Sequence, residues 1–186
     1  MKNLKIWMGG VLLVAILVCS LILFGKWAAE VALQKKIQAA RNLVEEGWQL
    51  EQQGKLEEAL AHYDQALTLD PGCAVAYKHR GTTFSRRGEF EKALAEFNKA
   101  IQLDPTHASS YYNRGILYMD HKDYDRAITD YSKAIEWVPT YTNAILNRAV
   151  VYCYEGKNKE ALADYDRYLK MVPSLDKPEP KQARSR

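Results

Sequence analysis

The chain has 186 residues, 47% of them hydrophobic and 26% charged, and its formal net charge is +3 at pH 7. This length suits one domain with extensions. The positive charge lies at the two ends: residues 1–39 carry +4 and residues 174–186 carry +2, which leaves −3 for residues 40–173. Because that central part has no basic stripe, nucleic acid is not expected as a partner.

The N-terminal part contains an apolar run that is long enough to cross a membrane. Residues 6–25, IWMGGVLLVAILVCSLILFG, include no charged side chain, and about 20 residues of helix span the hydrocarbon core. Trp7 and Trp27 lie near the two ends of the run, where indole rings favour the headgroup layers. We predict a single transmembrane anchor within residues 1–26.

Two other interpretations of this run weigh less. A cleaved signal peptide has a shorter apolar core, and a cut after Ser20 would leave an apolar stump at residues 21–24. A lipoprotein signal would need a small residue before Cys19, where this chain has Val18.

The side of the membrane that the rest of the chain faces is indicated less clearly. Basic residues flank the apolar run on both sides, so the positive-inside rule is nearly balanced. The short basic N-terminus favours staying in the cytoplasm, which would place the part of the chain after the apolar run outside it, in the periplasm of a Gram-negative cell. Cys73 and Cys153 match no disulfide, zinc or redox spacing, and free thiols favour the cytoplasmic alternative.

Residues 27–39 are rich in helix-forming residues and contain no proline. We predict a helical linker here that continues into the next segment, unless Gly25 or residues 38–40 break the helix.

A single sequence period governs the remainder of the chain. Four sets of residues recur every 34 positions. They are Pro71, Pro105, Pro139 and Pro173; Ala59, Ala93, Ala127 and Ala161; Tyr63, Phe97, Tyr131 and Tyr165; and Gly47, Gly81 and Gly115, with Ala149 fourth. Each unit contains two apolar helical stripes separated by a turn, as at Gly88. A helix-turn-helix unit of about 34 residues, with small residues at the crossings and a terminal proline, is typical of the tetratricopeptide repeat.

The chain therefore resembles the tetratricopeptide-repeat family. The resemblance implies an all-α fold, a right-handed superhelical solenoid of helix-turn-helix repeats behind the transmembrane helix. The expected repeats are residues 40–73, 74–107, 108–141 and 142–173. Residues 174–186 are polar and contain two prolines, so we predict a disordered basic tail.

The resemblance also implies where a partner binds, because the first helices of successive tetratricopeptide repeats line a concave groove. The groove residues expected on this basis are Trp48, Lys78, Thr82, Tyr112, Asn113, Ile116, Met119, Asn143, Leu146, Asn147, Val150 and Tyr154. The set is apolar for a surface that faces solvent. It belongs either to the core or to a groove for an apolar or amphipathic segment of another protein.

One subfamily captures the C-terminal carboxylate of chaperones with Lys and Asn side chains. Lys78 and Asn113 fit that pattern, whereas Thr82 stands where Asn is required and Asn143 and Asn147 stand where basic groups are required. A chaperone tail is therefore not the expected ligand.

Two charged series share the period. An arginine recurs at Arg80, Arg114 and Arg148, and an acid recurs at Glu96, Asp130 and Asp164. We predict ion pairs between repeats, because stacking requires such regular spacing.

The fourth repeat departs from the pattern, with Tyr168 in place of a small residue. Its last helix is expected to leave Leu162, Tyr165 and Leu169 partly exposed, as a candidate edge for self-association.

No catalytic, metal or cofactor site is expected, because the four histidines form no ligand pair and no nucleophile or phosphate-loop motif is present. The predicted function is a membrane-anchored scaffold that recruits a partner protein through the groove, in assembly of a membrane or envelope complex. The alternatives are a self-associating oligomer scaffold and a regulatory subunit of a membrane enzyme.

Overall fold

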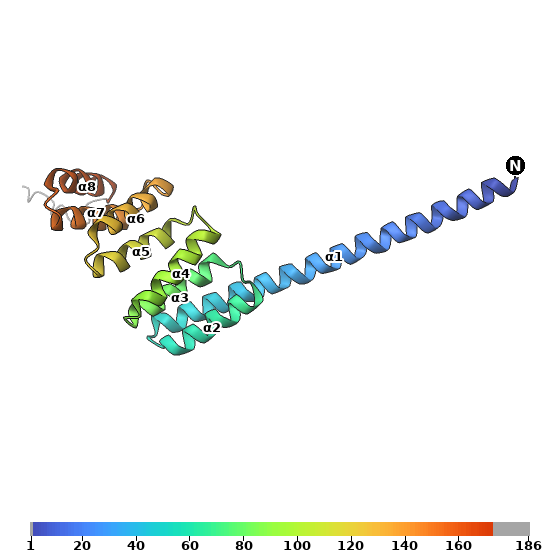
Figure 1. Cartoon of the computed structure of the whole chain (residues 1–186), viewed down its shortest axis with the longest axis horizontal. Helices are drawn as coiled ribbons and strands as arrows, with labels where there is room; N and C mark the ends of the chain where they lie inside the picture. The colour runs from blue at the N-terminus through green and yellow to red at the C-terminus, as the bar shows by residue number, and fades with distance from the viewer. Residues whose placement is uncertain (1, 173–186) are drawn as a thin grey trace, which may run out of the picture.

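The computed structural model describes the backbone of residues 2–172 and the side chains of residues 20–172. Within these residues the chain forms helices and no strands. The helices are α1 (Lys2–Gln52), α2 (Leu56–Leu69), α3 (Ala74–Arg86), α4 (Phe90–Leu103), α5 (Ala108–Asp120), α6 (Tyr124–Trp137), α7 (Thr142–Tyr154) and α8 (Asn158–Met171). Figure 1 shows α1 projecting as a lone helix from a row of stacked helix pairs. The all-α helical-repeat fold predicted from the sequence is confirmed.

The odd-numbered and the even-numbered helices have different neighbours in the array. Within each repeat the two helices pack together, α1 with α2, α3 with α4, α5 with α6 and α7 with α8. In the described part of the chain, odd-numbered helices also contact the next odd-numbered helix, whereas the even-numbered helices make no such contact with one another. The array therefore curves toward the odd-numbered side. We call the surface formed by α3, α5, α7 and the part of α1 from Ala40 onward the inner face.

The two helices of a repeat cross at a glycine that lies beneath an aromatic ring. A Cβ atom on Gly115 would lie 2.8 Å from the ring of Tyr131, and one on Gly81 would lie 2.9 Å from the ring of Phe97. Real Cβ atoms do not approach so closely, so only glycine permits this crossing. Tyr131 and Phe97 are in turn almost fully buried. The periodic glycines and aromatic residues are thus partners in one contact.

The predicted arginine–acid pairs form, but each lies within one repeat. Arg114 donates from Nε and Nη2 to the two carboxylate oxygens of Asp130, at 2.7 and 2.8 Å. Its remaining Nη1 reaches back to Asn98 of the preceding repeat at 2.5 Å. Arg80 and Arg148 repeat this geometry, with Asp64 and Ser132 as the acceptors in the preceding repeat. The contact between repeats is therefore a third arginine hydrogen bond that the pattern of charges did not reveal.

The first helix of each repeat ends near a residue with left-handed backbone. These residues are Gly54 (φ 77°), Gly88 (φ 76°), Lys122 (φ 60°) and Gly156 (φ 70°), at equivalent positions of the four repeats. Glycine adopts this conformation without steric cost, whereas a side chain with a Cβ does not. The turn between α5 and α6 therefore carries a local strain that the other three turns lack.

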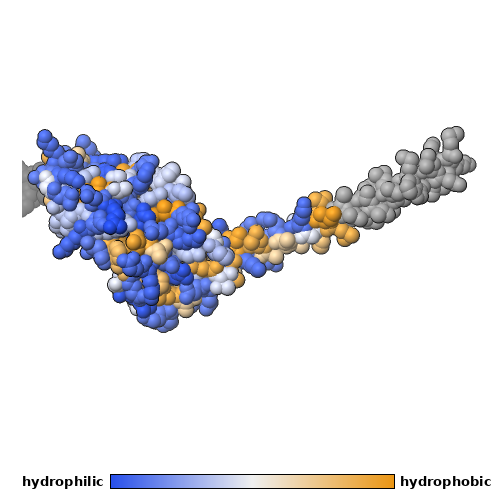
Figure 2. Space-filling view, viewed as in Figure 1, coloured by the Kyte–Doolittle hydropathy of each residue, from blue (hydrophilic) through white to orange (hydrophobic). Residues whose placement is uncertain are grey.

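α1 runs without a break from the N-terminal residues through the linker 27–39 into the first repeat. Its apolar residues Leu21, Ile22, Leu23, Phe24 and Trp27 are exposed, and Figure 2 shows a hydrophobic section beside the grey N-terminal segment. Among the residues whose side chains are described, no helix has the length and hydropathy of a membrane span. The side chains of most of the predicted anchor, residues 6–25, and all of the predicted tail, residues 174–186, lie outside the described part, so the membrane span and the disordered tail both stay predictions.

Replacing Lys122 by glycine should raise the free energy of unfolding by about 0.5–1 kcal/mol, because the left-handed backbone no longer carries a Cβ. The reverse change at the equivalent turn, Gly88→Lys, should lower it by a similar amount. Urea unfolding of the two variants followed by circular dichroism checks both signs. A loss of stability in Lys122→Gly would contradict the strain.

Removal of the Arg114 guanidinium should leave the Asp130 carboxylate buried without its partner. Burial already raises the pKa of Asp130, and Arg114 opposes that rise. Arg114→Met should therefore cost about 3–5 kcal/mol at pH 7. In the variant the folded pKa of Asp130 would rise further above its unfolded pKa. The loss of stability should therefore shrink as the pH falls through the folded pKa toward the unfolded pKa. The exposed pair Arg126–Asp123 provides the control, since Arg126→Met should leave the unfolding midpoint nearly unchanged.

Candidate functional site

The twelve residues predicted for the groove all lie on the inner-face helices, but they differ in exposure. Trp48, Asn143 and Tyr154 are exposed, and the other nine are half-buried. Tyr112, Ile116 and Met119 pack against the core cluster that contains Tyr131 and Ile145. The middle of the predicted groove is therefore partly a packing surface, which is the core alternative that the sequence had left open.

Polar side chains on the inner face bond to one another across neighbouring helices. Asn113 of α5 donates from Nδ2 to the hydroxyl of Thr82 on α3, at 3.2 Å. Asn147 of α7 donates from Nδ2 to the hydroxyl of Tyr112 on α5, at 3.3 Å. These four predicted groove residues thus brace the spacing of α3, α5 and α7, and part of their hydrogen-bonding capacity is already used.

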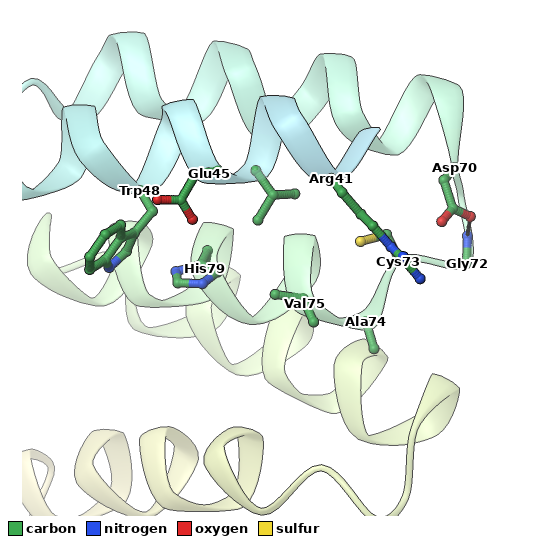
Figure 3. A pocket seen from close by; sticks show the side chains of 10 residues that line it. Arg41, Glu45, Trp48, Asp70, Gly72, Cys73, Ala74, Val75 and His79 are labelled. Atoms are coloured by element: carbon green, nitrogen blue, oxygen red, sulfur yellow. Dashed lines mark hydrogen bonds between the residues drawn. The ribbon is translucent and has the colours of Figure 1, made fainter. Parts of the chain in front are cut away.

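A cavity of about 610 Å³ opens between α1 and α3 at the N-terminal end of the inner face. We call it the α1–α3 cavity. Its lining residues are Arg41, Val44, Glu45, Trp48, Asp70, Gly72, Cys73, Ala74, Val75 and His79. In Figure 3 the lining side chains are spread along α1 and α3, with Trp48 and His79 toward one end and Arg41, Cys73 and Gly72 toward the other.

Two apolar side chains on opposite walls of this cavity are open to solvent. Trp48 on α1 is 41% exposed and Val75 on α3 is 40% exposed. Val44 also lines the cavity, is nearly buried, and belongs to the hydrophobic core cluster that contains Tyr63. Exposed large apolar side chains that converge on a concave site are the usual composition of a protein-binding or ligand-binding pocket.

A buried carboxylate next to this cavity connects α1 with α3. Glu51 on α1 is 3% exposed and accepts a hydrogen bond from the hydroxyl of Tyr63 at 3.1 Å. Arg86 of α3 donates to both the backbone oxygen and the carboxylate of Glu51, at 3.0 and 3.3 Å. The His79 ring lies 3.8 Å from the same carboxylate. Glu51 therefore ties α1 to α3 through Arg86 and lies next to the cavity residue His79.

Lys78 is a lysine of the inner face whose pKa is strongly lowered. Burial lowers its pKa to about 8, and the negative charge of Glu51 opposes the shift. Its Nζ lies 2.8 Å from Nε2 of His79, whose own pKa is also lowered by burial. Within the described residues, Lys78 forms no ion pair with a carboxylate. Functional sites often contain a charged side chain whose pKa is shifted because its burial costs free energy of desolvation.

Of the residues that line the cavity, only Trp48 belongs to the twelve predicted for the groove. The sequence period nevertheless identifies the positions of two others. Val75 occupies the repeat position of Asn143, and His79 occupies the repeat position shared by Asn113 and Asn147. The existence of the cavity had no sequence signal, because it depends on how far apart α1 and α3 lie. Within the described residues, no group of three or more His, Cys, Asp or Glu side chains is placed to hold a metal ion.

Replacing Lys78 by methionine should stabilise the free protein by about 1–3 kcal/mol at pH 7, because the desolvation of the ammonium is removed. The folded pKa of Lys78 lies below its unfolded value, so its penalty is present below pH 8 and fades as the pH rises toward 10.5. The advantage of the variant should fade in the same range. Urea unfolding at pH 7 and above pH 8 measures it, and Lys159→Met, an exposed site on α8, should show no such gain.

Comparison with known proteins agrees with the repeat architecture. A tetratricopeptide-repeat model matches residues 40–73 and 108–141, and a second model, described as a TPR repeat, matches residues 81–122. No match is found among curated protein sequences. The crystal structure of MamA is 25% identical with a TM-score of 0.65, and the match covers 75% of this chain and 84% of that chain.

Two further solved structures have the same fold. The Pseudomonas aeruginosa pilF structure is 23% identical with a TM-score of 0.70, covers 74% of this chain and 63% of that one, and shows the fold alone. The first TPR of Spaghetti (RPAP3), bound to the HSP90 peptide SRMEEVD, is 25% identical with a TM-score of 0.61 and covers 64% of this chain and 95% of that one. With its helix pairs, its glycine crossings and these matches at residues 40–73 and 81–141, the chain belongs to the tetratricopeptide-repeat family.

Proposed function

We propose that the protein is a membrane-anchored scaffold that binds a segment of a partner protein on its inner face, with the α1–α3 cavity as the main attachment point. Tetratricopeptide-repeat proteins act in general as non-enzymatic interaction scaffolds. The observation that carries the finer proposal is the pair of exposed apolar walls, Trp48 and Val75, that face a cavity of about 610 Å³. A cavity of this size accommodates one or two large side chains of a partner.

The chemistry of the cavity favours an amphipathic partner segment. An apolar side chain fits between Trp48 and Val75, while Arg41 and Glu45 at the rim can bond the partner's backbone or polar groups. Lys78, on the helical turn next to Val75, offers an ammonium without a carboxylate partner in the described part of the chain. Apolar contacts would supply affinity, and the few polar groups would fix the orientation of the segment.

The first TPR of Spaghetti is bound to the HSP90 peptide SRMEEVD, but the inner face of this chain favours a different ligand. Of the positions expected for a carboxylate clamp, Lys78 and Asn113 match, and the Asn113 amide is already bonded to Thr82. Asn143 and Asn147 offer no positive charge. We therefore propose a partner segment that is anchored by an apolar side chain rather than by a terminal carboxylate.

The membrane part of the proposal rests on the uncharged run of residues 6–25 and on the exposed apolar side chains of α1. Five large apolar residues from Leu21 to Trp27 are exposed on a part of α1 that has no neighbour among the described residues. Such a surface is costly in water. Insertion into a bilayer would cover it. We place the array outside the cytoplasm, with a cytoplasmic array as the alternative.

The thiols of the array provide the test of this orientation. Cys153 is exposed and free, so a membrane-impermeant maleimide should label it in intact spheroplasts if the array lies outside the cytoplasm. The Cys153→Ser variant is the control for labelling at other sites. Labelling that requires lysis of the cells would reverse the orientation, and recovery of the protein in the soluble fraction would contradict the anchor.

Removing the apolar walls should abolish partner capture without unfolding the array. The double variant Trp48→Ser, Val75→Ser should lose at least about tenfold in affinity, as expected for the centre of an apolar contact. The partner is first identified by crosslinking from native membranes with mass spectrometry, and affinity is then measured by calorimetry. Trp137→Ser, Val138→Ser is a matched control, because these residues have nearly the same exposure and lie outside the cavity. Equal losses in both variants, or none in the first, would contradict the proposed site.

A further inference from the structure

The outer surface of α8, the last helix of the array, repeats a surface that is covered in the earlier repeats. Leu169 is 68% exposed, whereas its equivalents Leu67 and Ile135 are 8% and 6% exposed and the third equivalent, Ile101, is half-buried. Leu67 packs with Ala76 and Tyr77 of α3, and Ile135 packs with Ala144 and Ile145 of α7. In both cases the cover is the first helix of the next repeat. For α8 no such helix follows within the described residues.

The equivalent positions two turns away show the same difference. Leu162 is 62% exposed, whereas its equivalents in the second and third repeats, Leu94 and Ile128, are partly buried against the core. Leu162 and Leu169 lie two helical turns apart, so they share one face of α8. We call the surface formed by Leu162, Asp166 and Leu169 the open edge.

Asp166 gives the open edge a polar acceptor with a defined role in the repeats. Its equivalents are Asp64, Asn98 and Ser132, and each accepts a hydrogen bond from the arginine of the following repeat, at 2.6, 2.5 and 2.9 Å. Asp166 is exposed and lines a hollow of about 430 Å³ with Ala163, Arg167, Lys170 and Met171. Of the four acceptors, Asp166 alone has no arginine from a following repeat within the described residues.

The helices that cover the earlier edges have a common pattern. Each carries an arginine with an apolar or aromatic residue three positions before it and an aromatic residue four positions after it: Tyr77, Arg80 and Phe84; Tyr111, Arg114 and Tyr118; Ile145, Arg148 and Tyr152. The guanidinium lies over a neighbouring ring in every case, at 5.4 Å from Tyr77, 5.7 Å from Tyr111 and 5.8 Å from Tyr152. The ring thereby holds the arginine in the position from which it reaches the acceptor.

We propose that the open edge is a second binding surface, which takes an amphipathic helix of a partner protein in the place of a fifth repeat. The partner helix carries an arginine for Asp166, an apolar residue three positions before it and an aromatic residue four positions after it. These side chains cover Leu162 and Leu169 as the chain's own helices cover the earlier edges. This surface is separate from the α1–α3 cavity, so the two sites allow one scaffold to hold two partners.

A second copy of this chain fits the open edge less well. In the first repeat the residues equivalent to the covering pattern are Leu43, Glu46 and Leu50. Stacking one array on another would therefore place Glu46 opposite Asp166, which is a repulsion where the other junctions have an ion pair or a hydrogen bond. The chain's own residues 173–186 contain no aromatic residue and so lack the covering pattern as well.

The test uses the full chain in lipid nanodiscs and a stapled helical peptide that copies residues 108–120, with the equivalents of Tyr111, Arg114 and Tyr118. Fluorescence anisotropy should show saturable binding. Asp166→Arg in the protein, or glutamate for the arginine in the peptide, should each weaken binding at least tenfold, and the two changes together should restore it. Asp125→Arg, a charge reversal at an exposed site on α6, is the matched control and should leave binding unchanged. Helicity measured by circular dichroism confirms that each variant is folded.

Three results would overturn the proposal. Binding that is indifferent to both charge reversals would place the peptide elsewhere. A dimer of the full chain that dissociates on Leu169→Ser, measured by sedimentation, would make a second copy the occupant. An increase in peptide affinity of tenfold or more on truncation after Val172 would show that the chain's own C-terminal residues cover the edge. Failure of the Trp48 and Val75 variants to affect capture would bear on the cavity alone, because none of these measurements involves that site.

Discussion

The close crossing of two helices at a glycine determines most of this structure. In the first three repeats an aromatic ring, Tyr63, Phe97 or Tyr131, lies where a Cβ would otherwise stand, so the two helices approach within the thickness of one ring. The fourth repeat has Ala149 at this position, and its ring, Tyr165, is half-buried rather than buried. The last hairpin is thus the least tightly packed and also the one whose outer surface is open.

The arginine that recurs from the second repeat onward converts separate hairpins into one array. Two of its hydrogen bonds fix the second helix of its own repeat, and the third reaches the preceding repeat, as Arg114 shows. One side chain therefore sets both the angle within a hairpin and the stacking between hairpins. The same geometry accounts for the character of the open edge. Because the arginine always reaches backward along the chain, the last acceptor, Asp166, receives no donor from a following repeat within the described residues.

The inner face divides into two parts with different physical roles. From α3 to α7, polar bridges such as Asn113 to Thr82 and Asn147 to Tyr112 brace the helices. Between α1 and α3, the exposed Trp48 and Val75 leave an apolar cavity instead. α1 lines this cavity from Arg41 to Trp48 and also forms the linker 27–39. A partner held there would therefore lie about 20–35 Å along the helix from the proposed membrane anchor. The scaffold function proposed above depends on that rigid connection.

The sequence by itself determined the repeat architecture, because glycine, aromatic, alanine and proline residues at a strict period permit one way of packing helix pairs. The twelve predicted groove residues all lie on α1, α3, α5 and α7, and their role in binding stays a prediction. The sequence also identified the exposed leucines of α8. The tertiary structure alone decided which of those groove residues are free. Ile116 and Met119 pack into the core, Asn113 and Asn147 bond to neighbouring helices, and the cavity at Trp48 depends on the separation of α1 and α3. It also showed that the arginine–acid pairs close within repeats while a third hydrogen bond joins them. The sequence period shows which positions are equivalent in the repeats. The distance between two helices, however, depends on the combined size of all the side chains packed between them, so it cannot be predicted from any single position.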